Sequence, residues 1–315
     1  MNLVDLGRTG LRVSRLCFGT LTMGPLQLGL PPEEGARLIA KALDSGVNFF
    51  DTADAYGTYP HLKLGLSGRR PEAVVATKSY AHTAADMRRD IERALRELCT
   101  DYLDIMLLHE QESAQTVAGH REALECVLAA VQAGVVRAAG VSTHSVACAE
   151  HCARLPEVAV IHPLLNRAGI GLLDGTAADM AAAAARARAA GQGIYTMKAL
   201  AGGHLSADPV GAIQWVLRLD VAHSVAVGIA TEAELVMNNC LVLGLPVPEA
   251  VATAAARRLR RLHVEDWCHG CGECISRCPQ GALAVEAGRV AVDCAACVLC
   301  GYCAGACRDF CLKVV

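Results

Sequence analysis

The chain has 315 residues, of which 53% are hydrophobic and 19% are charged, and its formal net charge is −3. This composition supports a sizeable buried core and excludes a disordered chain, while the length suits one large domain plus a small one. The weak negative charge argues against nucleic acid or an anionic membrane as a partner. The sequence shows no signal-peptide pattern and no apolar run of the roughly 18 residues that span a membrane, so we expect a cytoplasmic protein.

Strand-like and helix-like patterns alternate through the first 245 residues. Residues 1–15 predict a short hairpin. Eight apolar runs predict buried parallel strands at 15–20, 47–52, 73–78, 104–109, 135–142, 158–163, 193–198 and 224–228. Apolar residues at three- and four-residue intervals predict helices that include 32–45, 84–99, 117–133 and 177–190. This order predicts an α/β fold, the (β/α)8 TIM barrel. A doubly wound open sheet is the alternative, but no G-x-G-x-x-G follows the first strand.

Ionisable residues stand at the ends of three consecutive predicted strands. Asp51, Lys78 and His109 end the second, third and fourth strands, and Tyr56 follows Asp51 in the next loop. One such residue alone is more often an ordinary surface or hydrogen-bonded group. Four that share one rim of a barrel predict a proton-transfer site, because a buried lysine or aspartate needs a partner.

The segments that carry these residues, together with Leu-Gly-Arg-Thr-Gly-Leu-Arg-Val-Ser at 6–14, resemble the aldo/keto reductase family over about residues 3–243. The resemblance implies that Tyr56 donates a proton to a substrate carbonyl, that Lys78 and Asp51 tune it, and that His109 orients the carbonyl. Because a nearby ammonium favours a phenolate, we expect Lys78 to lower the pKa of Tyr56 from its usual value of about 10.

The resemblance also implies NAD(P)H as cofactor, although several contacts differ from the family pattern. Ser142 is kept, but the asparagine after strand five and the glutamine of strand six are missing, and Met197 replaces a stacking aromatic. The candidate cofactor-binding residues are Gly19, Thr20, Ser142, Met197, Lys198, Gly228, Ile229 and Asn238. Glu234 stands where a base would grip a 2′-phosphate, which favours NADH over NADPH. A solvated helix residue and a barrel that no longer binds nicotinamide are the alternatives.

Ten of the 16 cysteines crowd into the end of the chain, which indicates a metal domain. The run C-x2-C-x2-C-x3-C at 268–278 is the bacterial ferredoxin pattern for a 4Fe–4S cluster, and it recurs 29 positions later at 297–307. Zinc is a distant second. The resemblance to a two-cluster ferredoxin implies one cluster on Cys268, Cys271, Cys274 and Cys307, and another on Cys297, Cys300, Cys303 and Cys278. Cys294 and Cys311 fall outside the repeat and are expected not to be ligands.

These patterns predict a barrel at 1–245, a helical linker at 246–262 and a small α+β ferredoxin-like domain with two clusters at 263–315. The leading interpretation is an oxidoreductase that reduces a carbonyl or related group of a small molecule, with NAD(P)H as hydride source and the clusters for electron transfer; an external electron-transfer partner also fits. A hydride carries two electrons and a cluster carries one. Two alternatives therefore stay open: clusters that feed single electrons to the substrate without nicotinamide, or a non-catalytic electron carrier.

Overall fold

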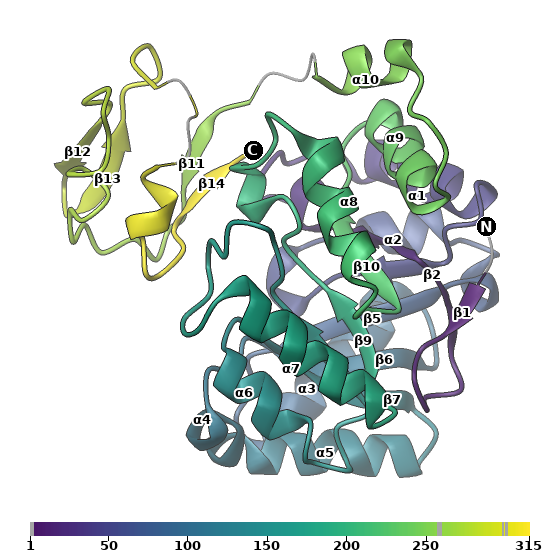
Figure 1. Ribbon diagram of the computed structural model, residues 1–315. Coiled ribbons are helices and arrows are strands. Elements are labelled where there is room, and N and C mark those ends of the chain that lie inside the picture. The colour runs from purple at the N-terminus through teal and green to yellow at the C-terminus, as the bar shows by residue number, and fades with distance from the viewer. Residues whose placement is uncertain (1–2, 257–259, 298, 300–301) are drawn as a thin grey trace.

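The computed structural model describes residues 3–256, 260–297, 299 and 302–315. Eight parallel strands close into a barrel, in the order β10-β3-β4-β5-β6-β7-β8-β9 (Figure 1). They are β3 (Leu16–Gly19), β4 (Phe49–Asp51), β5 (Val74–Ser79), β6 (Leu103–Leu108), β7 (Val136–Thr143), β8 (Val160–Pro163), β9 (Gly193–Thr196) and β10 (Ser224–Gly228). The predicted TIM barrel is confirmed, and each strand lies within or beside its predicted run.

Helices surround the barrel and follow its strands. They are α1 (Pro32–Asp44), α2 (Tyr59–Gly65), α3 (Ala84–Leu98), α4 (Ala114–Gly119), α5 (Arg121–Gln132), α6 (Val146–Cys152), α7 (Ala177–Ala189), α8 (Pro209–Leu219) and α9 (Glu232–Val242). The single helix predicted at 117–133 is wrong. His120, with φ −102° and ψ 17°, separates α4 from α5, and its ring contacts the Thr116 carbonyl at 2.7 Å.

The inside of the barrel is filled at one end by the predicted N-terminal hairpin, which is confirmed as β1 (Leu3–Asp5) and β2 (Arg12–Ser14). Leu6, Leu11 and Val13 pack with inward side chains of the strands. Gly7 has φ +53°, and a Cβ there would lie 2.4 Å from a backbone nitrogen of β9. The hairpin thus seals the N-terminal ends of the strands, and chemistry is left to the C-terminal rim.

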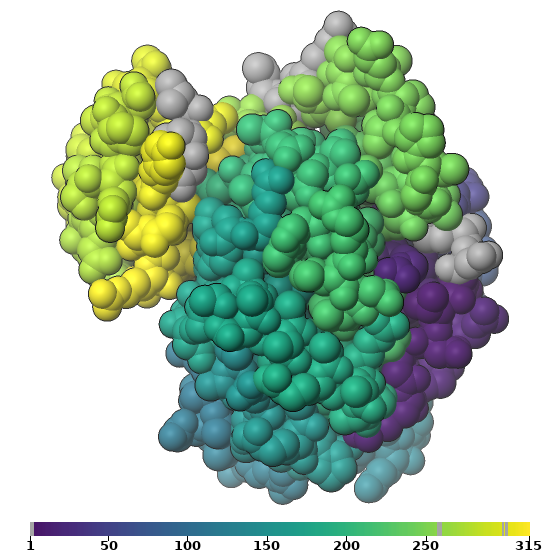
Figure 2. Space-filling view, in the orientation of Figure 1, coloured from purple at the N-terminus to yellow at the C-terminus, as the bar shows by residue number. Residues whose placement is uncertain are grey.

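The end of the chain forms a small lobe beside the barrel (Figures 1 and 2). Two antiparallel pairs build it: β11 (Leu262–Val264) with β14 (Leu312–Val314), and β12 (Leu283–Glu286) with β13 (Arg289–Val292). Their apolar side chains share a core with cysteines. Helix α10 (Glu249–Ala256) covers part of the predicted linker, whose residues 257–259 lie outside the described chain. In the described part, no helix has the length and apolarity to cross a membrane.

Candidate active site

A buried ion pair stands at the centre of the barrel rim. Side chains alternate along a strand, so Asp51, two residues after Phe49, points into the barrel, and Lys78 does the same on β5. The Lys78 Nζ donates to Asp51 Oδ2 at 2.7 Å and to the Thr52 carbonyl at 2.8 Å. Lys78 is only 1% exposed. This pairing satisfies a charge that could not otherwise be buried.

Two residues that the sequence did not single out flank the Asp51 carboxylate on the far side of the barrel. The Tyr195 hydroxyl donates to Asp51 Oδ1 at 2.9 Å, and His162 Nε2 lies 3.6 Å from the same oxygen. The two rings stack with centroids 3.8 Å apart. Burial lowers the pKa of His162 to about 4, so its ring is neutral near pH 7. The alternation of β8 and β9, which turns both side chains inward, was the available signal.

Tyr56 ends the 3-10 turn η2 (Asp54–Tyr56) and faces the ion pair. The Lys78 Nζ lies 4.8 Å from the centroid of its ring. Burial, reinforced by the Asp51 charge, raises the pKa of the Tyr56 phenol well above its usual value. The expectation that Lys78 lowers this pKa is therefore wrong, because the ammonium is hydrogen-bonded to Asp51 and burial dominates. The phenol keeps its proton at neutral pH and can still donate it to a more basic oxygen.

His109 closes the constellation. Its ring centroid lies 5.7 Å from that of Tyr56, and it stacks on Tyr80 with centroids 4.2 Å apart. Burial lowers the pKa of His109 to about 3, so the ring is neutral and has one N–H to donate. The structure thus brings all four predicted rim residues together around one point.

A second charged group extends the rim. The Lys198 Nζ lies 2.9 Å from His144 Nε2 and 3.7 Å from Glu110 Oε1, while the Tyr80 hydroxyl donates to Glu110 Oε2 at 2.6 Å. Burial would raise the pKa of Glu110, but Lys198, with His144, holds it well below its usual range. Sequence reasoning missed Glu110, which directly follows His109.

The C-terminal lobe adds its own side chains to this rim. Lys198 and Lys313 place their ammonium groups 4.4 Å and 3.2 Å from the centroid of the Phe310 ring. Lys313, only 5% exposed, also bonds the Phe310 carbonyl. Burial, with repulsion from Lys198, lowers the pKa of Lys313 well below its usual value.

A large cavity of about 730 Å³ lies between the barrel rim and the lobe. Tyr56, Tyr80 and His109 line it from the barrel, and Trp267 and Phe310 line it from the lobe. Apolar and aromatic walls with a few convergent polar groups are the usual features of a small-molecule site. The cavity is therefore the candidate substrate site, and both parts of the chain build it.

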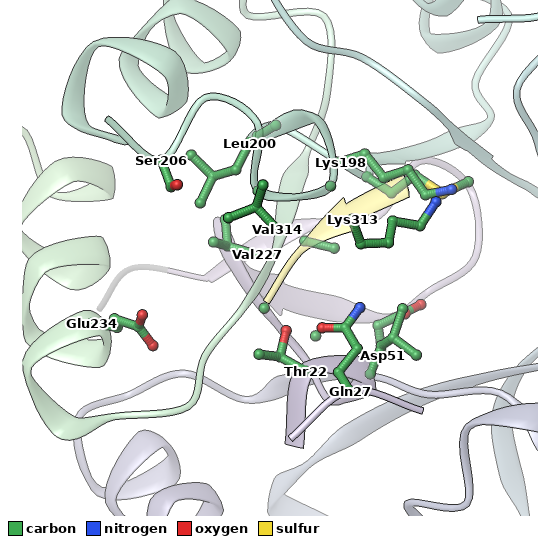
Figure 3. A pocket seen from close by; sticks show the side chains of 18 of the residues that line it. Thr22, Gln27, Asp51, Lys198, Leu200, Ser206, Val227, Glu234, Lys313 and Val314 are labelled. Carbon is green, nitrogen blue, oxygen red and sulfur yellow. The ribbon is translucent and has the colours of Figure 1, made fainter. Parts of the chain in front are cut away.

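A smaller hollow of about 160 Å³, the cleft, also has Tyr56 among its lining residues, and Figure 3 shows other residues of its wall. Four candidate cofactor residues line it: Gly19, Met197, Lys198 and Gly228. Four others do not line it. Thr20 bonds the Asp51 carbonyl, Ser142 accepts the Glu110 N–H, and Ile229 and Asn238 are buried behind the rim. The cofactor contacts of all eight residues stay predictions.

Four predicted cluster ligands surround one hollow in the lobe, namely Cys268, Cys271, Cys274 and Cys307. The Ala282 N–H donates to Cys278 Sγ at 3.4 Å and the Cys311 N–H to Cys307 Sγ at 3.2 Å, so the sequence repeat also recurs in the hydrogen bonds. This donor set fits a 4Fe–4S cluster, although in the described chain no group of three or more such side chains is placed to hold a metal ion. Cys311, expected not to be a ligand, also lines the hollow.

The second predicted ligand set is described only in part. Cys297, Cys303 and Cys278 belong to the core of the lobe, and Cys300 lies outside the described residues. The second cluster stays a prediction. Cys294, the other expected non-ligand, is exposed.

A parallel barrel with an Asp–Lys–Tyr–His rim is the architecture of an oxidoreductase, and comparison with known proteins gives the family. Residues 15–237 match the aldo/keto reductase family, and residues 263–284 match a 4Fe-4S binding domain. The chain belongs to the aldo/keto reductase family and carries an iron–sulfur domain at its end. The match to a 4Fe-4S binding domain favours an iron–sulfur cluster over zinc for the C-terminal cysteines.

Curated relatives match only in part. The chain is 35% identical over 133 residues to an uncharacterized oxidoreductase of Bacillus subtilis, covering 35% of this chain and 40% of that protein. It is 31% identical over 157 residues to the 6-dehydroglucose reductase of Novosphingobium aromaticivorans, covering 44% of this chain and 50% of the relative. The chain thus spans half or less of these relatives.

A solved structure, that of a putative aldo-keto reductase from Pseudomonas aeruginosa, is 28% identical with a TM-score of 0.64. The match covers 81% of this chain and 96% of that one. The aldo-keto reductase from Bacillus halodurans in its holo form, 21% identical and covering 81% of this chain and 95% of its own, shares the fold with a TM-score of 0.64. The match to the aldo/keto reductase family supports a nicotinamide cofactor, and the match to the 4Fe-4S domain supports an iron–sulfur centre.

Proposed function

We propose that this protein reduces a carbonyl or related group of a small molecule bound in the cavity, with Tyr56 as proton donor and the iron–sulfur domain as electron source. The observation that carries this proposal is that the hollow of the predicted cluster ligands and the substrate cavity share lining residues. The hollow of the four thiols and the substrate cavity are both lined by His269 and Asp309. A 4Fe–4S cluster bound by Cys268, Cys271, Cys274 and Cys307 supplies electrons one at a time.

The rim residues have separate roles in this proposal. Tyr56 gives its proton to the carbonyl oxygen as negative charge develops there, and neutral His109 donates a hydrogen bond to the same oxygen. Lys78, held by Asp51, keeps a positive charge beside the phenolate that forms. The Tyr195 hydroxyl fixes the orientation of Asp51, and the His162 ring stacks on Tyr195. His109, with its pKa of about 3, does not change charge between pH 5 and 9.

The reaction balances with an external one-electron donor. The C=O π bond breaks, an O–H and a C–H bond form, and two electrons and two protons are consumed. Tyr56 supplies the proton to oxygen and recovers it from water, and solvent in the cavity supplies the proton to carbon. An electron-transfer protein or another low-potential reductant is oxidised by two electrons for each alcohol formed.

Hydride transfer from NAD(P)H is the second candidate, which the family fold favours. The cleft beside Tyr56 supports it less well, because β8 lacks the glutamine of the family pattern and its His162 contacts the Tyr195 carbonyl at 2.6 Å with its Nδ1. Met197 offers no aromatic face. The preference for NADH over NADPH, drawn from Glu234, belongs to this candidate alone.

A matched pair of enzymes tests the proposal. Wild type and Tyr56→Phe are incubated anaerobically with a panel of aliphatic and aromatic aldehydes and ketones, with reduced methyl viologen as donor, and the alcohols are measured by chromatography. We expect wild type to form an alcohol and Tyr56→Phe to form it at least about 100-fold more slowly with unchanged iron content. Equal rates in the two proteins would exclude Tyr56 as the proton donor.

A further inference from the structure

The C-terminal strand β14 lies across the cleft. Figure 3 shows the strand with the side chains of Lys313 and Val314, which belong to it. Both line the cleft, as do Asp51 and Gln27. The strand is part of the lobe, because it pairs with β11. It is also part of the barrel site, because its side chains line the cleft. A segment of the iron–sulfur domain thus contributes to the hollow that four of the predicted nicotinamide-binding residues line.

The barrel surface is shaped to receive this strand. The turn η4 (Ala201–Gly203) presents Gly203 at φ +90°, and a Cβ there would lie 1.9 Å from the Val314 carbonyl oxygen. A Cβ on Gly202 would lie 3.0 Å from the Phe310 ring. The buried His204 Nε2 contacts the Leu312 carbonyl at 2.9 Å. Only glycine allows the chain to approach so closely, so the strand has a fitted seat on the barrel.

The space that remains is small for a dinucleotide. The cleft measures about 160 Å³, whereas pockets for drug-sized ligands have volumes of about 300–1,000 Å³. At the N-terminus of α9 the carboxylate of Glu234 already occupies the place of an anion, and its Oε1 lies 3.8 Å from the guanidinium of Arg260, which also lines the cleft. There Glu234 Oε2 accepts the backbone N–H groups of Ala230 at 2.8 Å and Thr231 at 3.2 Å. These are donors that an anion would need at that helix end.

From this geometry we propose that β14 and a nicotinamide dinucleotide compete for one cleft, so that the protein with its C-terminal strand docked excludes the dinucleotide. The strand is a resident ligand of the barrel, supplied by the iron–sulfur domain. Dinucleotide binding then requires the strand to leave, and the apparent affinity falls by the fraction of molecules in which it has left. The inference concerns binding and stands apart from the role of Tyr56.

Truncation tests the competition directly. A chain that ends at Cys311 lacks residues 312–315 and hence β14. Binding of NADH and of NADPH is measured anaerobically by fluorescence titration without substrate, for the truncated and the full chain. We expect the truncated protein to bind one of them at least about tenfold more tightly. Equal affinities, or no binding by a truncated protein that keeps its fold and iron, would overturn the inference.

A point variant in the intact chain covers the case in which truncation disturbs the lobe. His204→Ala removes the ring that contacts the Leu312 carbonyl, and His61→Ala is the matched control. His61 is equally buried, and its Nε2 contacts the Leu30 carbonyl, also at 2.9 Å, away from the strand. Loss of one hydrogen bond that holds the strand should tighten NADH or NADPH binding about three- to tenfold in His204→Ala alone. The same change in both variants, or in neither, would contradict the competition.

The outcomes separate this inference from the proposed function. Tight dinucleotide binding by the full chain removes the competition and leaves the role of Tyr56 intact. Unchanged turnover in Tyr56→Phe removes the proton donor and leaves the competition intact, because the titrations contain no substrate.

Discussion

Two hollows meet at Tyr56, and they differ in how the C-terminal lobe borders them. The cavity, about 730 Å³, lies open between Tyr56 on the barrel and Trp267 on the lobe. The cleft, about 160 Å³, is narrowed by Lys313 and Val314 of the same lobe. The lobe therefore forms a wall of the space available to a substrate and reduces the space available to a nicotinamide. The iron–sulfur domain thus contributes side chains to the candidate active site of this barrel.

The largest expected effect comes from removing a thiol on the lobe side of the cavity. Cys274→Ser replaces a buried predicted ligand, and Cys294→Ser replaces an exposed cysteine outside the repeat. We expect Cys274→Ser to lose about half of the bound iron and nearly all viologen-dependent reduction, because a four-thiolate site loses a ligand. Iron analysis and turnover should leave Cys294→Ser like wild type. Full activity in an iron-depleted Cys274→Ser would break the link between lobe and cavity.

The buried ion pair of Asp51 and Lys78, next to Tyr56, comes next. Lys78→Met leaves the Asp51 carboxylate buried without its cation, which should lower the free energy of unfolding by about 3–5 kcal/mol. Lys41→Met is the control, because its pair with Glu232 is solvent-exposed and should cost less than about 1 kcal/mol. Denaturant unfolding of the three proteins measures both values. Equal decreases in the free energy of unfolding in the two variants would mean that the buried pair stabilises the fold no more than the exposed pair does.

A smaller effect is expected from the phenol that holds Asp51. Tyr195→Phe removes a hydrogen bond to a charged oxygen, worth about 1.5–3 kcal/mol. Tyr80→Phe also removes a phenol–carboxylate bond, but Tyr80 is 51% exposed, and less than about 1 kcal/mol should be lost. The same unfolding experiment compares them. A larger loss in Tyr80→Phe would show that the far wall of the barrel does not hold the carboxylate.

The smallest effect is a pH dependence of stability. Burial holds the pKa of His162 at about 4 in the folded protein, against about 6.5 when unfolded. As pH falls from 7.5 to 5.5, the unfolded chain takes up a proton that the folded chain does not. The free energy of unfolding should therefore fall by about 1 kcal/mol from this histidine. In His162→Gln that part of the fall should vanish. A fall of equal size in the variant would exclude His162 as its source.

The sequence predicted the four rim residues because three of them stand at predicted strand ends and Tyr56 lies in the loop that follows one, and a parallel barrel brings strand ends to one rim. It could not predict how strongly they are buried, which is why the expected direction of the pKa of Tyr56 was wrong. Tyr195 was missed because its bond to Asp51 joins residues 144 positions apart. Lys313 and Phe310 were missed for a related reason: the docking of the lobe on the barrel leaves no periodic signal in either segment.

The most direct test of the central claim follows the clusters themselves. The full protein, reduced anaerobically with dithionite and freed of excess reductant, is mixed with a carbonyl compound that it converts, without nicotinamide, and the cluster absorbance is followed by stopped flow. We predict that the clusters are reoxidised as the alcohol forms. In Tyr56→Phe the reoxidation should be at least about 100-fold slower. Clusters that stay reduced in the presence of substrate, while NADH or NADPH alone supports turnover, would contradict it.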